Sequence, residues 1–516
     1  MSDESNGKNK IPFDDKIDWW PMHQHDPSNS GYSTSEAPNS NNILWTFKQQ
    51  EPLLYSSPII DNSRLYVGFG DNIYCLNAET GIELWNFATG DRICHSQAVV
   101  NGMLYIGSDD HNIYCLNAET GEKIWNYTTE DLVWVWCYII VAEGKVFVGP
   151  LNGKMYCLDA ITGKEIWTFK TGDGRWSSPA VAYGKVYFNS YSILYCLDAN
   201  NGKMIWHFPV ENSTGNTPTV FEGKVFFGTS RRDLARDFRA YCLDAETGEE
   251  IWDFPLEFDM RSSPSIAYGN VYVIQDRFKI GNHGFPKFNP LFDNLNIFNN
   301  IYKRPIAKMY CLDLETGKEL WNFSSLNDFG PYSIADGKIF SSTSWFGTSA
   351  GIICLNAYNG SQIWNFSTEY YAVSTPAICC GKVYVGAGDT ISKNGTVYCF
   401  GDPPAPPKFE IGDFIADLGS ISTEIGNVGN TTAEGVNCSL SIKGGILQYI
   451  NINTIEHFED IDPGEMVSVF SDRFIFGLGK INIHITVNAV NAESVSKQAH
   501  GFVFGPLIFI DRDQNQ

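Results

Sequence analysis

The stretch that decides the fold reads Tyr74-Cys75-Leu76-Asn77-Ala78-Glu79-Thr80-Gly81-Ile82-Glu83-Leu84-Trp85, and it recurs along the chain. Each copy has a cysteine, an Asn or Asp two residues later, a glycine six residues later and a tryptophan ten residues later. The copies start at Cys75, Cys115, Cys157, Cys196, Cys242, Cys311 and Cys354. An eighth cysteine, Cys399, has no tryptophan after it, and Trp45 has no cysteine before it. These two incomplete copies complete each other.

The chemistry of the repeat predicts four strands. Tyr74–Leu76 is apolar and aromatic, as in a short strand, and the residues after it form a turn whose glycine can adopt a positive φ. A second hairpin follows each tryptophan, for example Ala180–Ala182, a turn at Gly184 and Val186–Phe188. Most successive tryptophans are about 40 residues apart, as in 125 − 85 = 40. Four strands in about 40 residues are typical of a β-propeller blade.

Eight repeats predict an all-β, eight-bladed β-propeller of four-stranded blades over residues 43–401. Trp45 would then lie on the outer strand of the last blade, beside the strand of Cys399. The N-terminal and C-terminal strands would close the ring together, and this closure removes the open sheet edge.

The motif resembles the tryptophan-docking repeat of the quinoprotein alcohol dehydrogenase-like propellers, the pyrroloquinoline quinone (PQQ) repeat, with Cys in place of the family's first Ala. The resemblance covers residues 19–400 and implies a structural docking role for eight tryptophans. These are Trp45, Trp85, Trp125, Trp167, Trp206, Trp252, Trp321 and Trp364. The superfamily includes PQQ enzymes and non-catalytic scaffolds such as the propeller lipoprotein of outer-membrane barrel assembly, so the resemblance leaves activity open.

Composition excludes several partners. The chain has 516 residues, a formal net charge of −23 and a pI near 4.7, so it lacks the basic footprint of a nucleic-acid binder. Of its 13 cysteines, eight occupy the same strand position in successive repeats. Such positions are too far apart for disulfides, and we expect small buried hydrophobes there. No zinc-type Cys/His spacing is present, and we expect a monomer without a metal site.

The N-terminal region divides in two. Residues 1–18 are polar and predict a disordered tail. Residues 19–42 resemble the lead-in segment of such propellers, and we expect this segment to pack on the propeller. His23, His25 and Asp26 could bind a metal, but a polar loop packed over one face is the better interpretation. No signal peptide and no membrane-spanning run is visible, so the protein is cytoplasmic if the chain is complete, or extracellular if an export signal is missing.

The loops that enter the innermost strands line the predicted mouth of the central channel. Aromatic and arginine side chains there suit a planar anion, whereas the alternative is a solvent-filled channel with ordinary loop residues. The candidate ligand site comprises His95, Trp136, Arg175, Trp176, Asn216 and Arg261. Two insertions, Arg231–Arg239 and residues 276–305, are expected on the same face, as functional loops or as covers of a blade edge.

The composition changes after the propeller. Residues 402–407 form a Pro-rich linker, and residues 408–516 alternate over about seven short strands, which predicts an immunoglobulin-like sandwich. The segments Glu424–Ala433 and Ile461–Glu465 resemble turns of CARDB-type adhesion domains on bacterial and archaeal surfaces. Phe502–Ile510 is apolar but too short to cross a membrane, so we expect it to be a buried last strand.

Two classes of function remain. A PQQ- and calcium-dependent alcohol or sugar dehydrogenase would, by the family resemblance, use a calcium ion, an Asp base and often a vicinal disulfide. Cys379-Cys380 is the only vicinal pair, but it aligns with Ala182-Tyr183 at a hairpin turn away from the channel mouth. No catalytic residue is therefore assigned. We favour a non-catalytic interaction protein that presents loops to a protein, peptide or glycan partner, at the cell surface by resemblance. A binder of a small planar anion is the third possibility.

Overall fold

The computed structural model describes residues 17–53, 56–93, 97–130, 138–149, 153–171, 177–211, 216–230, 237–260, 262–276, 307–325, 328–344, 350–372, 374–389, 394–403 and 406–511. It divides into two compact units, Met1–Asp402 and Pro403–Gln516. Both units consist of β-strands, and the one helical element in the described residues is the 3₁₀ turn η1 (Ile446–Gln448). No helix in those residues is long and apolar enough to cross a membrane.

The first unit contains the following strands in chain order. The first group is β1 (Tyr32–Ser33), β2 (Ile43–Gln49), β3 (Ile59–Asp61), β4 (Arg64–Phe69), β5 (Asn72–Asn77), β6 (Glu83–Ala88), β7 (Ala98–Val100), β8 (Met103–Gly107), β9 (Asn112–Asn117), β10 (Lys123–Thr128), β11 (Ile140–Ala142) and β12 (Lys145–Val148). The second group is β13 (Lys154–Asp159), β14 (Glu165–Lys170), β15 (Ala180–Ala182), β16 (Lys185–Ser190), β17 (Ile193–Asp198), β18 (Met204–Pro209), β19 (Thr219–Phe221), β20 (Lys224–Gly228), β21 (Phe238–Asp244), β22 (Glu250–Leu256), β23 (Asp259–Met260) and β24 (Ser265–Ala267). The third group is β25 (Asn270–Asp276), β26 (Ala307–Asp313), β27 (Glu319–Ser325), β28 (Asp328–Ala335), β29 (Lys338–Ser344), β30 (Ala350–Asn356), β31 (Gln362–Thr368), β32 (Tyr371–Ala372), β33 (Ala377–Cys379), β34 (Lys382–Asp389) and β35 (Asn394–Gly401).

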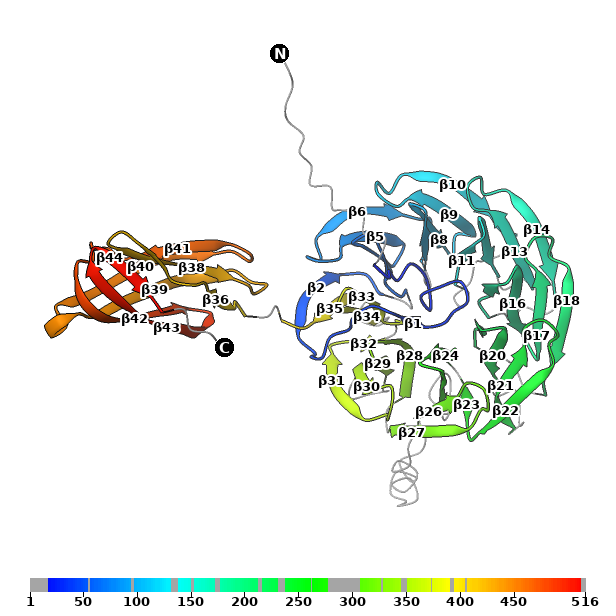
Figure 1. Ribbon diagram of the computed structural model, residues 1–516. Helices are drawn as coiled ribbons and strands as arrows, with labels where there is room; N and C mark the ends of the chain where they lie inside the picture. The colour runs from blue at the N-terminus through cyan, green and yellow to red at the C-terminus, as the bar shows by residue number, and fades with distance from the viewer. Residues whose placement is uncertain are drawn as a thin grey trace, which may run out of the picture. The chain divides into compact units, whose positions relative to one another are not determined.

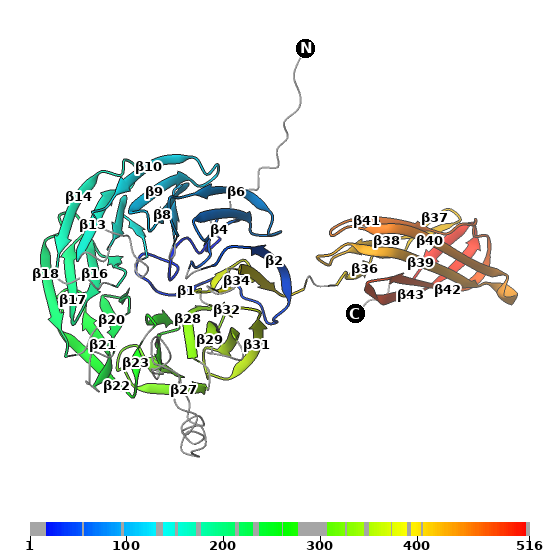
Figure 2. The ribbon, with the colours of Figure 1, turned by 180° about the vertical axis from the view of Figure 1, so that it is seen from behind.

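These strands form sheets that follow one another around a ring, the arrangement of a β-propeller (Figure 1). The view from behind shows the same circular order (Figure 2). In the described residues of the first unit, most sheets are simple four-stranded meanders such as β11-β12-β13-β14, with short strands such as β11 toward the centre and longer strands such as β14 at the rim. The all-β prediction and the prediction of four-stranded units are therefore confirmed.

The sheet β3–β6 shows why the repeat folds in this way. From Leu65 onward β4 is buried, because it is covered on both faces by neighbouring sheets, whereas β6 alternates between exposed and half-buried residues at the rim. The turn between β5 and β6 is built by Asn77, whose Oδ1 accepts hydrogen bonds from the N–H groups of Glu79 and Thr80 at 2.9 and 3.0 Å. Gly81 completes the turn with a φ of 71°.

Tryptophan side chains connect each sheet to the next. The indole of Trp167 in β14 lies against Gly202 of the next sheet so closely that a Cβ on Gly202 would be 2.7 Å from the ring. Its Nε1–H donates to the carbonyl of Ala199 at 3.0 Å. The same Trp–Gly contact occurs in the pairs Trp45–Gly81, Trp85–Gly121, Trp125–Gly163, Trp206–Gly248, Trp252–Gly317 and Trp321–Gly360. The last tryptophan, Trp364, packs instead on Phe400, because that sheet lacks the Thr-Gly turn.

The ring closes through strands from both ends of the unit. β2 is the outer neighbour of β35, and the register places Trp45 opposite Cys399. Trp45 in turn contacts Gly81 of the sheet β3–β6. The two incomplete copies of the repeat therefore share one sheet.

The second unit contains two sheets that share a hydrophobic core. Its strands are β36 (Phe409–Ile411), β37 (Ile415–Asp417), β38 (Ser420–Asn427), β39 (Ala433–Gly444), β40 (Ile450–Ile461), β41 (Met466–Phe470), β42 (Gly477–Ala489), β43 (Ala492–Gly505) and β44 (Leu507–Ile510). One sheet is formed by β36, β37 and β41 around β38, and the other has the order β40-β39-β42-β43-β44. Ile421 and Val469 from the first sheet pack with Leu440 and Ile485 from the second.

Candidate functional site

The lead-in segment lies at the centre of the ring, where it appears dark blue in Figure 1. Its backbone carbonyls accept hydrogen bonds, at 2.7–2.9 Å, from the N–H groups of residues in the innermost strands of six sheets. The acceptor and donor pairs are Trp20–Ile60, Pro21–Val99, Pro27–Val181, Ser28–Val220, Ser30–Ile266 and Gly31–Ile334. β1 extends this contact as a parallel neighbour of β28. The segment is therefore bonded to most of the ring.

The lead-in leaves the ring on the side of the hairpin turns. The carbonyl of Glu36 accepts from the N–H of Gly381, in the turn between β33 and β34, at 3.1 Å. Farther along, the Asp402 carboxylate accepts from the N–H groups of Asn39 and Ser40 at 3.0 and 2.9 Å. Asn216, the one predicted ligand residue that the structure describes, precedes β19 and therefore lies toward the opposite end of an innermost strand.

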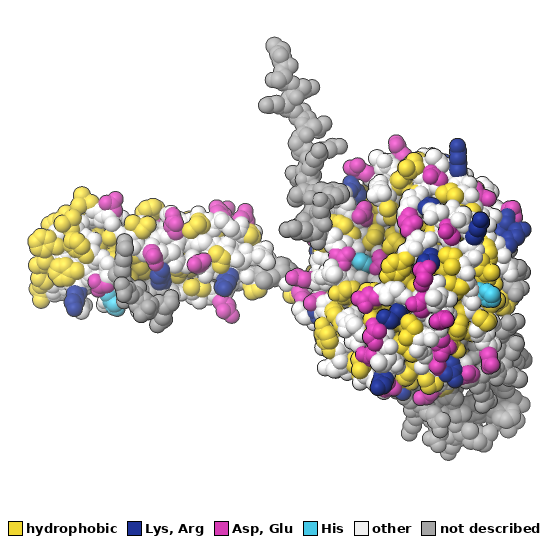
Figure 3. Space-filling view, turned by 45° about the vertical axis from the view of Figure 1, so that its right-hand side comes forward, with side chains coloured by type: hydrophobic (Ala, Val, Ile, Leu, Met, Phe, Trp, Pro, Cys, Tyr) yellow, Lys and Arg dark blue, Asp and Glu magenta, His cyan; other side chains and the backbone are white. Residues whose placement is uncertain are grey.

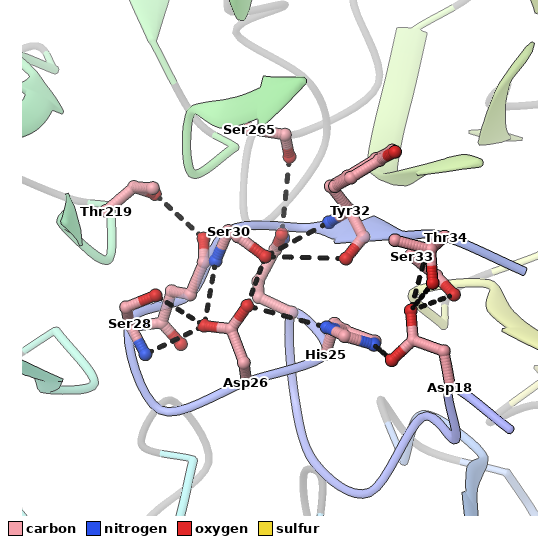
Figure 4. A network of polar contacts seen from close by, with 12 residues as sticks. Asp18, His25, Asp26, Ser28, Ser30, Tyr32, Ser33, Thr34, Thr219 and Ser265 are labelled. Carbon is pink, nitrogen blue, oxygen red and sulfur yellow. Dashed lines mark hydrogen bonds and ion pairs between the residues drawn. The ribbon is translucent and has the colours of Figure 1, made fainter. Parts of the chain in front are cut away.

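A charged network holds the lead-in together (Figure 4). His25 Nε2 lies 2.9 Å from Asp18 Oδ1, and His25 Nδ1 lies 3.4 Å from Asp26 Oδ2. Asp26 also accepts hydrogen bonds from Ser28 and Ser30, and Asp18 accepts from Thr34. These contacts fold residues 18–34 into a compact loop.

The protonation states follow from this geometry. Burial alone would lower the pKa of His25, but hydrogen bonds and charge from Asp18 and Asp26 outweigh burial and raise it to about 9. Burial would raise the pKa of both carboxyls, yet the His25 contacts hold the pKa of each below its usual value. His23 lies apart from these carboxylates and stacks on Tyr138 with ring centroids 3.3 Å apart. The network is therefore a structural clamp.

Most of the predicted channel-mouth residues lie outside the described residues. These are His95, Trp136, Arg175, Trp176 and Arg261, together with residues 231–236 and 277–305 of the two insertions. Asn216 is described and is buried. Its Oδ1 accepts from the N–H of Gly228 at 3.1 Å and its Nδ2 donates to the carbonyl of Met260 at 3.2 Å. Both ends of this amide are therefore bonded to backbone.

The hydrogen bond between Asn216 and Gly228 has counterparts in other sheets, which the sequence analysis missed. Ser56, Ser177 and Ser374 occupy the same position in their sheets, and each hydroxyl accepts from the N–H of the residue twelve positions later, at 2.7–2.9 Å. The signal was present in the sequence, because Asn216-Thr217-Pro218 aligns with Ser177-Ser178-Pro179. The Asn216 side chain fixes an entry loop to the second strand.

The second unit carries an apolar surface that the sequence analysis also missed. Phe502, Phe504 and Phe509 are 41%, 61% and 57% exposed, so the prediction of a buried last strand is wrong for these side chains, although Val503 joins the core. The reason is that only one face of this sheet packs on the core, so residues that alternate with the buried Val503 of β43, such as Phe502 and Phe504, point away from it. We define the apolar end as the exposed side chains Ile446, Leu447, Tyr449, Phe474, Phe476, Leu478, Phe502, Phe504, Leu507 and Phe509. Figure 3 shows hydrophobic side chains gathered at one end of this unit.

Backbone contacts bring the parts of the apolar end together. Leu478 lies opposite Phe504, and Phe504 lies opposite Leu507, on three neighbouring strands. The N–H of Gly445, just before η1, donates to the carbonyl of Lys480 at 2.7 Å. Residues 444–450, 474–479 and 501–510 contain no charged residue. The result is a continuous apolar surface made by three uncharged segments.

Comparison with solved structures shows the fold. A quinohemoprotein alcohol dehydrogenase, ADHIIG from Pseudomonas putida HK5, is 15% identical, with a TM-score of 0.57 over 77% of this chain and 83% of that chain. BamB from Moraxella catarrhalis is 14% identical, with a TM-score of 0.52 over 70% of this chain and 97% of that chain. The computationally designed Ika8 protein is 11% identical, with a TM-score of 0.55 over 72% of this chain and all of that chain, 100%. Enzymes, an assembly factor and a designed protein thus share this fold.

Sequence comparison is more specific. A search of curated proteins finds no match. A family model described as outer membrane protein assembly factor BamB matches residues 34–133, 138–192, 190–282 and 307–398. These segments cover most of the ring of sheets and more than half of the chain.

Proposed function

Because the chain belongs to the family of outer membrane protein assembly factor BamB, we propose that it is a non-catalytic scaffold that binds a protein partner. The propeller supplies a rigid frame, since Trp–Gly contacts join its sheets and the lead-in is bonded to the innermost strands. Rigid frames suit binding because little conformational entropy is lost when a partner docks.

The finer architecture belongs to the same proposal. The sheets of the first unit are eight blades over residues 43–401, the eight tryptophans dock these blades, and residues 402–407 are a linker. The second unit, residues 408–516, is an immunoglobulin-like domain of the CARDB type, and its resemblance to adhesion domains supports a location at the cell surface. The two sheets around one core, with five strands in the larger sheet, support a sandwich.

The apolar end of the second unit is the observation that carries the proposal. Leu447 and Tyr449 are 81% and 83% exposed, and such large contiguous apolar surfaces mark interaction sites. Asp472, Arg473 and Lys480 border the uncharged segments in the sequence, and we infer that charges of both signs surround an apolar centre. This is the anatomy of a protein–protein interface. We infer a protein partner whose complementary surface is apolar at its centre.

A photo-crosslinking experiment tests this proposal. A benzoylphenylalanine at position 449 in the full chain, expressed in its native cells, should give one discrete protein adduct after irradiation. The same probe at position 455 is the matched control, because Ile455 is 73% exposed on the same unit but outside the apolar end. Adducts to the same protein at both positions, adducts only to lipid, or adducts only to a second copy of the chain would each overturn the proposal.

The dehydrogenase alternative makes a different prediction. Asn216, the one candidate ligand residue that the structure describes, is occupied by backbone bonds and does not fit as a ligand of a quinone or another planar anion. We therefore expect no saturable heat or thermal shift on titration with PQQ and calcium. A true ligand at a hundredfold excess over its Kd would stabilise the native state by about 2.7 kcal/mol. A saturable shift that is lost in Arg175→Ala or Trp176→Ala would favour the enzyme.

A further inference from the structure

Two cysteines stand side by side at the hairpin turn between β33 and β34. Cys379 is the last residue of β33 and is buried, whereas Cys380 is in the turn, has a φ of 56° and is exposed. Their sulfur atoms are 2.8 Å apart. The turn therefore holds two thiols in contact, one of them open to solvent.

The other described cysteines differ from Cys380 in accessibility and ionisation. Each is buried, and burial raises the pKa of each thiol to about 12, so these thiols are inert. They are Cys75, Cys115, Cys157, Cys196, Cys242, Cys311, Cys354, Cys399 and Cys438. At Cys380 the hydrogen bond from the Cys379 thiol and the charge of Lys382 lower the pKa, while burial and Glu79 oppose them. The thiolate, which is the reactive form, is favoured there.

We propose that Cys379 and Cys380 form a redox-active dithiol that a small-molecule disulfide converts to a vicinal disulfide. In the first step the Cys380 thiolate attacks one sulfur of the oxidant R–S–S–R, which forms a mixed disulfide and releases one R–S⁻. In the second step the Cys379 sulfur loses its proton to solvent and attacks the Cys380 sulfur, which releases the second R–S⁻. The two cysteines are oxidised by two electrons, and the oxidant is reduced to two thiols.

The surroundings of the pair connect it to the lead-in. The N–H of Gly381, the residue after the pair, donates to the carbonyl of Glu36. The Cys379 thiol also interacts with Ser35 and with the charge of Asp18. Closing a ring across the peptide bond between the two cysteines changes the backbone of this turn. The redox state of the pair therefore acts on the place where the lead-in leaves the ring.

Oxidised glutathione and intact-mass spectrometry test the proposal on the reduced full chain. Peptide mapping of the wild-type protein should show that Cys379 and Cys380 lose both thiols and two hydrogens and that neither retains glutathione. In Cys379→Ser, attack by Cys380 has no resolving partner, so one glutathione should remain bound. In Cys380→Ser, the buried Cys379 should not react.

A matched control separates the pair from an ordinary exposed thiol. Glu222 occupies the equivalent turn position after β19, is exposed and has a φ of 45°. Glu222→Cys in the Cys380→Ser background should therefore retain one glutathione without losing a second thiol. A stable glutathione adduct on wild-type Cys380, no reaction at the pair, or equal behaviour of Cys380 and the control thiol would each overturn the proposal.

Discussion

Replacing Gly202 by alanine should destabilise the propeller more than replacing Gly184, and the difference measures one contact between a turn and an indole. The two glycines lie in the same sheet and have the same φ of 68°. A Cβ on Gly202 would be 2.7 Å from Cδ2 and Cε3 of Trp167, whereas a Cβ on Gly184 would meet no atom within 4 Å. The backbone strain is thus common to both variants, and the steric clash is not.

The magnitudes follow from these two terms. An alanine in the left-handed region costs about 1 kcal/mol, and both variants bear that cost. Overpacking at Gly202 adds about 1–3 kcal/mol, because Trp167 is buried and its Nε1–H bond to Ala199 opposes any movement of the ring. We therefore expect losses of about 1 kcal/mol for Gly184→Ala and about 2–4 kcal/mol for Gly202→Ala.

Urea unfolding followed by tryptophan fluorescence is the assay. All 14 tryptophans lie between Trp19 and Trp364, so the signal reports the first unit alone. The contrast can be repeated in a neighbouring sheet with Gly163, which also lies on an indole, and Gly144, which does not. Equal destabilisation by Gly202→Ala and Gly184→Ala would refute the idea that the Trp–Gly contact stabilises the ring.

Three further predictions concern the polar groups of the first unit, and the same unfolding assay measures all of them. Because the pKa of His25 is raised, its ion pairs stabilise the fold fully below pH 6.5, and this stabilisation is lost as the pH rises through about 9. The free energy of unfolding should fall by about 3 kcal/mol over this range in the wild-type protein, and the fall should be absent in His25→Gln. Asn216→Ala should lower the free energy of unfolding by about 2–4 kcal/mol, because the buried N–H of Gly228 and the carbonyl of Met260 lose their partner. Asn216→Ser should recover part of that stability. Asp402→Ala should lower the free energy of unfolding by about 1 kcal/mol, because the hydrogen bonds to the N–H groups of Asn39 and Ser40 are lost. An unchanged stability would show that other contacts hold the lead-in.

The ring could be predicted from the sequence because its signals are local and repeated. Trp45 and Cys399 are more than 350 residues apart (399 − 45 = 354), yet each lacks a partner that the other supplies. Their pairing follows from an incomplete motif at each end, and the structure places them opposite each other. The four-stranded units follow from two hairpins in every repeat.

The exposed phenylalanines, the hydrogen bonds of Asn216 and the bonds of the lead-in depend on tertiary contacts that a local sequence pattern does not contain. Phe502 and Phe504 are apolar in sequence, and they face outward because they lie on the face of β43 that does not pack on the core. The sequence predicts Asn216 as a ligand residue at a channel mouth, but its bond to Gly228 depends on a strand twelve residues away. Packing of the lead-in on the propeller is expected from the family resemblance, but its individual bonds are not, since they use backbone carbonyls, which no side-chain pattern reveals.

The sheet that closes the ring also receives the lead-in and carries the cysteine pair, and this coincidence has a physical consequence. β2 and β35 join the two ends of the unit by hydrogen bonds and side-chain packing, so this sheet lacks the covalent continuity of the other meanders. The turn at Gly381 and the carboxylate of Asp402 both hold the lead-in next to this closure. A change in the turn, such as oxidation of Cys379 and Cys380, therefore acts where the ring depends on non-covalent contacts. Closure and lead-in attachment should respond together to that change, whereas sheets on the far side of the ring should not.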